Sequence, residues 1–258
     1  MMKPERSLQV DKLTVEVYQD RPAMGRAAAK VAAEKMRELL GKQKSINVAF
    51  AAAPSQNEFL EALIKEPGID WQRVRAFHLD EYLGLASDAP QRFAVFLDEH
   101  IFGKVNFGQI HYLRGDADSP EQEAQRYTEL LQRYPLDIAF IGIGENGHIA
   151  FNDPPVADFD DPHWVKSVTL DEICRQQQVN DGCFPTIDDV PKQALTLTIP
   201  AVMSAGVIYC MVPGATKAEA VKETVEGKIA TSCPATIMRR HDAAILYVDR
   251  DAAAMLAK

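Results

Sequence analysis

A histidine set among amides and carboxylates is the strongest chemical feature of the sequence. Residues 136–155 read LDIAFIGIGENGHIAFNDPP, which places His148 close to Glu145, Asn146, Asn152 and Asp153. An imidazole changes its protonation near neutral pH, and carboxylate or amide neighbours can hold it in one orientation. A solitary histidine is more often a hydrogen-bonded core residue. The polar and glycine neighbours of His148 favour acid–base chemistry instead.

The glycines of the same stretch have a second interpretation, which we reject. Gly142-x-Gly144-x-x-Gly147 matches the spacing of a dinucleotide-binding fingerprint. That fingerprint needs a helix to begin at its last glycine, and Pro154 and Pro155 follow too soon for one. We therefore expect no nicotinamide or flavin site. The glycines let the backbone turn sharply and approach a ligand closely.

Three other positions carry polar groups directly after a predicted strand. Asp80 and Glu81 form an adjacent pair of acids, which faces a cleft more readily than a core. Ser55 and Glu58 have the spacing of a helix capping box, and a capped helix start is a natural anion site. Lys217 adds a cation at the start of a later helix.

These positions are organised by strands and helices that alternate along the chain. Because parallel strands joined by helices end at one edge of a sheet, their polar ends should meet there. We predict one α/β domain over residues 1–258, with a doubly wound, mainly parallel sheet and helices on both faces. The expected strands cover 13–18, 46–52, 73–79, 137–143, 164–169, 194–199, 207–212 and 245–249. The expected helices cover 22–41, 90–102, 171–178 and 217–226, with others starting near 55 and 119 and a short one closing the chain.

The bulk composition narrows the class of protein. With 258 residues, a net charge of −9 and a pI near 5.2, the chain is unsuited to nucleic acid or to an anionic membrane surface. No apolar run approaches the eighteen residues that a membrane span needs. The cysteines form no Cys-x-x-Cys pair, so we expect no metal site, no disulfide framework and a cytoplasmic location; they are Cys174, Cys183, Cys210 and Cys233.

Two longer motifs resemble the glucosamine-6-phosphate deaminase (isomerase) family. They are Leu79-Asp-Glu-Tyr-Leu-Gly-Leu85 and Gly142-Ile-Gly-Glu-Asn-Gly-His-Ile-Ala-Phe-Asn-Asp-Pro154, supported by Val190-Pro, Ala194-Leu-Thr and Lys217…Val225-Glu-Gly227. The resemblance implies the Rossmann-like sugar-phosphate isomerase fold, which 6-phosphogluconolactonases share. It also implies an enzyme of amino sugar metabolism that needs no cofactor and acts on a small sugar phosphate.

The resemblance assigns a role to each of the residues picked out above. Asp80 would move a proton between C2 and C1 of the open-chain sugar. His148 would open the pyranose ring, with Asp153 and Asn146 holding its imidazole. The substrate-binding positions would be Ser55, Glu81, Gly144 and Lys217.

The sequence departs from the family where phosphate should bind. The family's Thr-Gly-Gly-Thr-Pro loop reads Ala52-Ala-Pro-Ser-Gln56 here, which removes two glycines and, at Pro54, one N–H donor. The acid after Phe-Asn is Asp153 instead of Glu. Cys183-Phe184 stands where a phosphate-binding arginine is expected, and Arg92-Phe93 replaces Ser-Tyr. We consider Arg92, Arg175 and Gln56 as replacement anchors.

The leading hypothesis is an aldose–ketose isomerase or deaminase that acts on a hexosamine phosphate or a close relative. One alternative is a 6-phosphogluconolactonase-like hydrolase in which His148 activates water, although the Phe151-Asn-Asp153 tail and the Asp80-Glu81 pair count against it. A second alternative is a non-catalytic sugar-phosphate sensor, which the altered loop favours. The family contains hexamers and monomers, so a homo-oligomer and a monomer both remain open.

Overall fold

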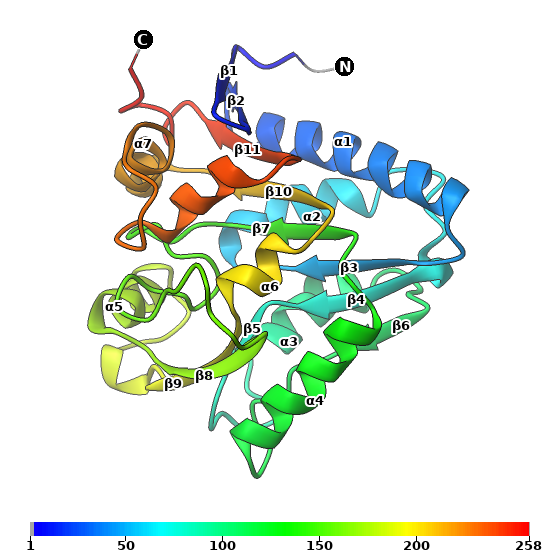
Figure 1. The fold of residues 1–258 in the computed structure, drawn as a ribbon, viewed down its shortest axis with the longest axis vertical. Coiled ribbons are helices and arrows are strands. Elements are labelled where there is room, and N and C mark those ends of the chain that lie inside the picture. The colour runs from blue at the N-terminus through cyan, green and yellow to red at the C-terminus, as the bar shows by residue number, and fades with distance from the viewer. Residues whose placement is uncertain (1–2, 258) are drawn as a thin grey trace.

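An eight-stranded sheet runs through the centre of the computed structural model, which describes residues 3–257 (Figure 1). The strand order is β1-β2-β11-β10-β7-β3-β4-β6, and every neighbouring pair is parallel except the β1–β2 hairpin. The strands are β1 (Arg6–Val10), β2 (Leu13–Tyr18), β3 (Ile46–Phe50), β4 (Val74–His78), β6 (Gln109–His111), β7 (Ile138–Ile141), β10 (Val207–Val212) and β11 (Ala244–Asp249).

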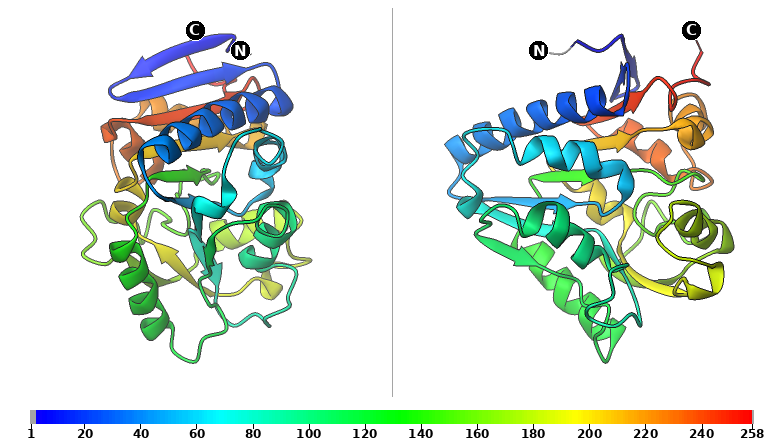
Figure 2. Two further views of the ribbon diagram at one scale, coloured as in Figure 1. Left: turned by 90° about the vertical axis from the view of Figure 1, so that its right-hand side faces the viewer. Right: turned by 180° about the vertical axis from the view of Figure 1, so that it is seen from behind.

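Helices cover both faces of this sheet (Figure 2). One hydrophobic core joins one face to α1 (Arg21–Lys42), α2 (Asn57–Leu63) and α3 (Phe93–Leu97), which continues as a π-helical turn. A second core joins the other face to α4 (Pro120–Arg133), α6 (Ile199–Met203) and α7 (Ala218–Glu226). The predicted doubly wound, mainly parallel α/β fold is confirmed.

A small antiparallel sheet that the sequence did not predict lies beside the large one. Its order is β5 (Asp80–Tyr82), β9 (Gln193–Leu197) and β8 (Val165–Thr169), and α5 (Glu172–Asn180) packs on it through a third apolar cluster. The strands expected at 164–169 and 194–199 therefore exist, but they belong to this second sheet. Nothing in the sequence of either strand specifies its partner strand.

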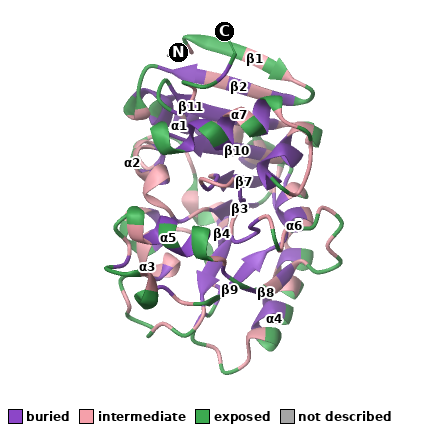
Figure 3. Cartoon of the chain, turned by 90° about the vertical axis from the view of Figure 1, so that its left-hand side faces the viewer, coloured by how far each residue is buried: buried purple, intermediate pink, exposed green. Residues whose placement is uncertain are grey.

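Burial follows the position of each strand in the large sheet. β3 and β7 are buried along their whole length, which explains their unbroken apolar sequences, whereas β1 at the edge is largely exposed (Figure 3). Because β3, β4, β7 and β10 are parallel neighbours, their carboxyl ends lie together at one edge of the sheet.

Two helix starts follow the predicted caps and one does not. Asp20 accepts from the N–H of Ala23 at 2.7 Å, and Ser119 accepts from that of Gln122 at 3.3 Å. The capping box predicted at Ser55 and Glu58 is wrong. A 3₁₀ turn, Pro54–Gln56, precedes α2, neither segment has a side-chain cap, and Glu58 pairs with Arg21 instead.

Residues 250–257 do not form the short closing helix that we predicted. Residues 250–255 form successive turns, including one closed by the N–H of Ala253 and the carbonyl of Asp249 at 3.0 Å. So short a segment gains too few hydrogen bonds to offset the cost of helix nucleation.

Candidate active site

Asp80 is held at the junction of the two sheets by a buried histidine. His78, the last residue of β4, lies with its Nδ1 2.9 Å from the carbonyl oxygen of Asp80, while its Nε2 accepts the N–H of Leu113 at 2.9 Å. Burial lowers the pKa of His78 to about 4, so the ring is neutral and donates from Nδ1. Burial, with the neighbouring Glu81 charge, raises the pKa of Asp80 well above its usual value.

Glu81 does not reach the substrate position that we predicted for it. Its carboxylate is fully buried and accepts three backbone N–H groups, from Tyr82 at 2.9 Å, Phe93 at 3.1 Å and Ala94 at 3.0 Å. This acid therefore fixes the start of α3 against β5. An acid directly after a strand can point to either side, and the paired sequence did not reveal which one faced the cleft.

The His148 turn depends on two glycines. Gly147 has a φ of +80°, a backbone conformation that residues other than glycine rarely adopt. A Cβ at Gly144 would collide with the His148 ring. Gly144 is thus required for the position of the imidazole. The prediction that no helix begins at Gly147 is confirmed, since residues 142–148 form an irregular turn.

The imidazole of His148 is oriented by the two residues proposed to hold it. Its Nδ1 lies 2.8 Å from Asn146 Oδ1 and 2.9 Å from Asp153 Oδ1, and Asn146 Nδ2 donates to the same Asp153 oxygen at 2.9 Å. Because both partners of Nδ1 are acceptors, the proton lies on Nδ1 and leaves Nε2 as a base. Burial acts to raise the pKa of Asp153, but its interactions with His148 and Asn146 oppose this, and the pKa is lowered.

One group of side chains offers the donor atoms of a metal site. His148, Asp153 and Cys174 place their ligand atoms within 4.8 Å of one another. Burial raises the pKa of the Cys174 thiol, which favours its protonated form. Asp153 of this group already contacts His148 Nδ1 and accepts a hydrogen bond from Asn146 Nδ2.

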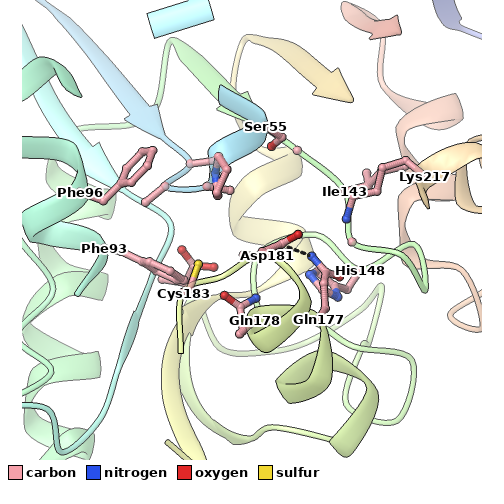
Figure 4. A pocket seen from close by; sticks show the side chains of 18 of the residues that line it. Ser55, Phe93, Phe96, Ile143, His148, Gln177, Gln178, Asp181, Cys183 and Lys217 are labelled. Carbon is pink, nitrogen blue, oxygen red and sulfur yellow. Dashed lines mark hydrogen bonds between the residues drawn. The ribbon is translucent and has the colours of Figure 1, made fainter. Parts of the chain in front are cut away.

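A cavity of about 580 Å³ joins these groups (Figure 4). Asp80 and His148 both line it, as do Ser55, Gly144 and Lys217. Lys217 follows the β10 end and is buried; burial lowers its pKa, while the negative charges of Asp181 and Glu145 oppose that shift. Five of the predicted site residues therefore line this one cavity; they are Asp80, His148, Ser55, Gly144 and Lys217.

The anchors considered for the phosphate point elsewhere. Arg175 is buried and donates to the carbonyl oxygens of Ile187 and Val190, and Arg92 lies between Glu81 and Asp116. Gln56 is turned inward, with Nε2 3.0 Å from Ser55 Oγ and 3.3 Å from the Met211 carbonyl oxygen. None of the three is among the residues that line the cavity. The sequence did not show that nearby carbonyl and carboxylate groups would accept the hydrogen bonds of these side chains.

Several residues that line the cavity were missed. Gln177, Gln178 and Asp181 project from α5 and the turn after it, and Gln177 Nε2 donates to Asp181 at 3.3 Å (Figure 4). The spacing of Gln177 and Asp181 predicts a shared helix face but not the cavity that it meets. Arg21, the first residue of α1, was missed although it lies in the segment after a strand end, as Ser55 does.

Comparison with known proteins places this geometry in a family. Residues 19–247 match the family described as glucosamine-6-phosphate isomerases/6-phosphogluconolactonase. The chain belongs to this family. The chain is 36% identical over 229 residues to a glucosamine-6-phosphate deaminase of Streptococcus suis. The aligned region covers 88% of this chain and 94% of that protein. A deaminase of the same name from Exiguobacterium sibiricum is 34% identical over 220 residues, 85% of each chain.

Solved structures of the family agree. A monomeric glucosamine-6-phosphate deaminase superposes with a TM-score of 0.86 at 31% identity, covering 93% of this chain and 99% of that one. The 6-phosphogluconolactonase of Thermotoga maritima superposes with a TM-score of 0.75 at 19% identity, over 92% and 100% of the two chains, which shows a shared fold only. Within residues 3–257, none of the helices combines the length and apolarity needed to cross a bilayer.

Proposed function

We propose that the chain converts a hexosamine 6-phosphate, with glucosamine 6-phosphate the first candidate, into the ketose 6-phosphate and ammonia. The observation that carries the proposal is that Asp80 and an oriented His148 line one cavity with Lys217. The similarity to glucosamine-6-phosphate deaminases supports the same reaction.

Ring opening is the step that suits His148. Its unprotonated Nε2 takes the proton of the anomeric hydroxyl and returns a proton to the ring oxygen, so the imidazole ends as it began. Asp153 and Asn146 hold the ring through Nδ1 and stabilise the imidazolium that forms in between.

Proton transfer between C2 and C1 suits Asp80. Burial brings the pKa of this carboxyl upward, towards the operating range of a general base. Asp80 removes the C2 proton of the open-chain aldose and delivers it to C1 of the enolamine. Water then adds to C2 of the resulting imine, and ammonia leaves. Lys217 holds the phosphate at the other end of the substrate.

The decisive experiment measures ammonia and ketose formation from glucosamine 6-phosphate beside the Asp80→Asn variant. We expect equimolar ammonia and ketose phosphate from the native protein and a loss of at least 10³-fold in kcat for the variant, because the base is then absent. A native protein that forms neither product would contradict the proposal.

The same preparation separates the two alternatives. Hydrolysis of 6-phosphogluconolactone that survives Asp80→Asn but not His148→Asn would indicate the hydrolase. Binding of amino sugar phosphates without turnover of any of them would indicate the sensor.

A further inference from the structure

The cavity has few cations with which to hold an anionic substrate. Of the residues in 3–257 that line it, only Arg21 and Lys217 carry cationic side chains. Arg92 and Arg175 are committed to partners outside it. The turn that replaces the family's loop has also lost an N–H donor at Pro54. The anionic end of a substrate therefore requires a donor that the resemblance did not identify.

Arg21 is fixed against that turn. Its Nε and Nη2 donate to Glu58 Oε1 and Oε2, both at 3.0 Å, and Nη2 also donates to the carbonyl oxygen of Pro54 at 2.9 Å. These bonds use three of the five N–H groups of the guanidinium. No acceptor within residues 3–257 contacts Nη1, which carries the other two.

A close helix contact holds Glu58 in place for this role. A Cβ at Gly25 would lie only 2.7 Å from the carbonyl carbon of Glu58, so α1 approaches α2 this closely because residue 25 is glycine. The guanidinium is thereby ordered before any ligand arrives. An ordered side chain loses less conformational entropy on binding than a free one does.

We propose that Arg21 is the second anchor of the substrate's anionic group, donating from Nη1 beside Ser55 while Lys217 supplies the other charge. In this chain an arginine at the start of α1 thus supplies donors in place of the N–H group that is lost at Pro54. The assignment of a sugar phosphate as the ligand rests on the proposed function. The assignment of Arg21 to an anion rests on the cavity alone.

The pairing with Glu58 sets the size of the expected effect. Because Glu58 neutralises the guanidinium at long range, Arg21 recognises the ligand through short, directional hydrogen bonds. Loss of a hydrogen bond to a charged group weakens binding by about tenfold to a hundredfold. The effect should fall on KM, since the anion lies away from the reacting carbons.

The test compares Arg21→Gln with Arg26→Gln, a matched control. Arg26 lies on the same helix but is exposed and borders a separate small hollow. For Arg21→Gln we expect KM for glucosamine 6-phosphate to rise at least tenfold with kcat within threefold. Inhibition by 2-amino-2-deoxyglucitol 6-phosphate should weaken equally, and inhibition by the same alditol without phosphate should not change. Arg26→Gln should leave all these constants unaltered.

A merely structural role for Arg21 gives a different pattern. If Arg21 only supports the turn, Arg21→Gln would weaken the phosphorylated and the unphosphorylated alditol alike, or would lower kcat with KM unchanged. Either result overturns the proposal. Arg21→Lys, which keeps the charge but loses the planar fork, should show an intermediate KM and guards against a variant that fails to fold.

Binding of inorganic phosphate, measured by calorimetry, separates this proposal from the proposed function. The native protein could turn over no amino sugar phosphate and still bind phosphate more tightly than Arg21→Gln does. That result would contradict the proposed function but support the role of Arg21 in binding the anion. If phosphate binds equally to the native protein and to Arg21→Gln, or binds to neither, the anchor is overturned whatever the activity.

Discussion

The adjacent carboxylates of Asp80 and Glu81 are both buried, but they differ in the hydrogen bonds that they accept. Glu81 accepts three backbone N–H groups, whereas no side chain or backbone donor in residues 3–257 satisfies the Asp80 carboxylate. Burial raises the pKa of both carboxyls, but at Glu81 these hydrogen bonds and the Arg92 charge oppose the shift, whereas at Asp80 the neighbouring Glu81 charge adds to it. Such a pairing is typical of an active site that gives up stability for reactivity.

This difference predicts opposite effects of two matched substitutions at neutral pH. The pKa of Asp80 is higher in the folded protein than in the unfolded chain. Its contribution to stability is therefore fully present at pH values below the unfolded pKa, and it is lost as the pH rises through the folded pKa. Asp80→Asn abolishes the ionisation of this side chain, so the variant should melt at a higher temperature than the native protein at pH 7 to 8. Each kcal/mol gained in the free energy of unfolding corresponds to a rise of about 2–4 °C in melting temperature. The gain should vanish near pH 3, where Asp80 is protonated in both states.

Glu81→Gln should instead lower the free energy of unfolding by roughly 1–3 kcal/mol, because an amide accepts fewer of the three N–H groups. Melting curves of both variants between pH 3 and pH 8 provide the measurement. A destabilised Asp80→Asn at pH 7.5 would show that its carboxylate is well solvated in the fold.

At the scale of elements, the contact between α1 and α2 positions the mouth of the cavity. It depends on Gly25, where an added methyl group would meet the backbone of Glu58 and Phe59. The same contact brings Arg21 to Glu58 and to the turn before α2. Packing between two helices far from the reacting carbons therefore shapes the anion end of the site.

Gly25→Ala should accordingly destabilise the protein by about 1–3 kcal/mol, since the overlap involves backbone that cannot move aside. Gly41→Ala is the control, because a Cβ at that helical position meets nothing within 4 Å. It should stabilise by roughly 0.5–1 kcal/mol through helix propensity. Urea unfolding monitored by circular dichroism measures both, and equal stability of the two variants would contradict the close packing of α1 on α2.

At the scale of the whole molecule, the cavity bridges the two sheets. Lys217 and Ser55 come from strand ends of the large sheet, Asp80 belongs to the small one, and Gln177 projects from the helix that packs on the small one. A ligand that contacts all of them ties the small sheet and α5 to the large sheet. Binding should therefore stabilise both sheets together.

An unreactive ligand at one hundred times its Kd should add about 2.7 kcal/mol to the free energy of unfolding, which corresponds to a rise of roughly 5–10 °C in melting temperature. Calorimetry with 2-amino-2-deoxyglucitol 6-phosphate tests this, with the unphosphorylated alditol at equal concentration as control. Two transitions, of which only one moves with ligand, would show that the sheets unfold independently and that the ligand does not join them.

Local pattern was enough to predict most strands, the caps at Asp20 and Ser119, the family, and five residues that meet at the cavity. These features depend on spacing within a few residues, or on strand ends that parallel topology brings to one edge. Only the tertiary structure decided that β5, β8 and β9 form their own sheet, that Glu81, Arg92 and Arg175 turn away, and that Arg21 lines the cavity. Each of these outcomes depends on hydrogen-bond partners distant in sequence, such as Glu81 with Ala94 and Arg21 with Glu58. A charged side chain goes where its buried partners are satisfied, and the linear sequence does not specify where those partners will lie.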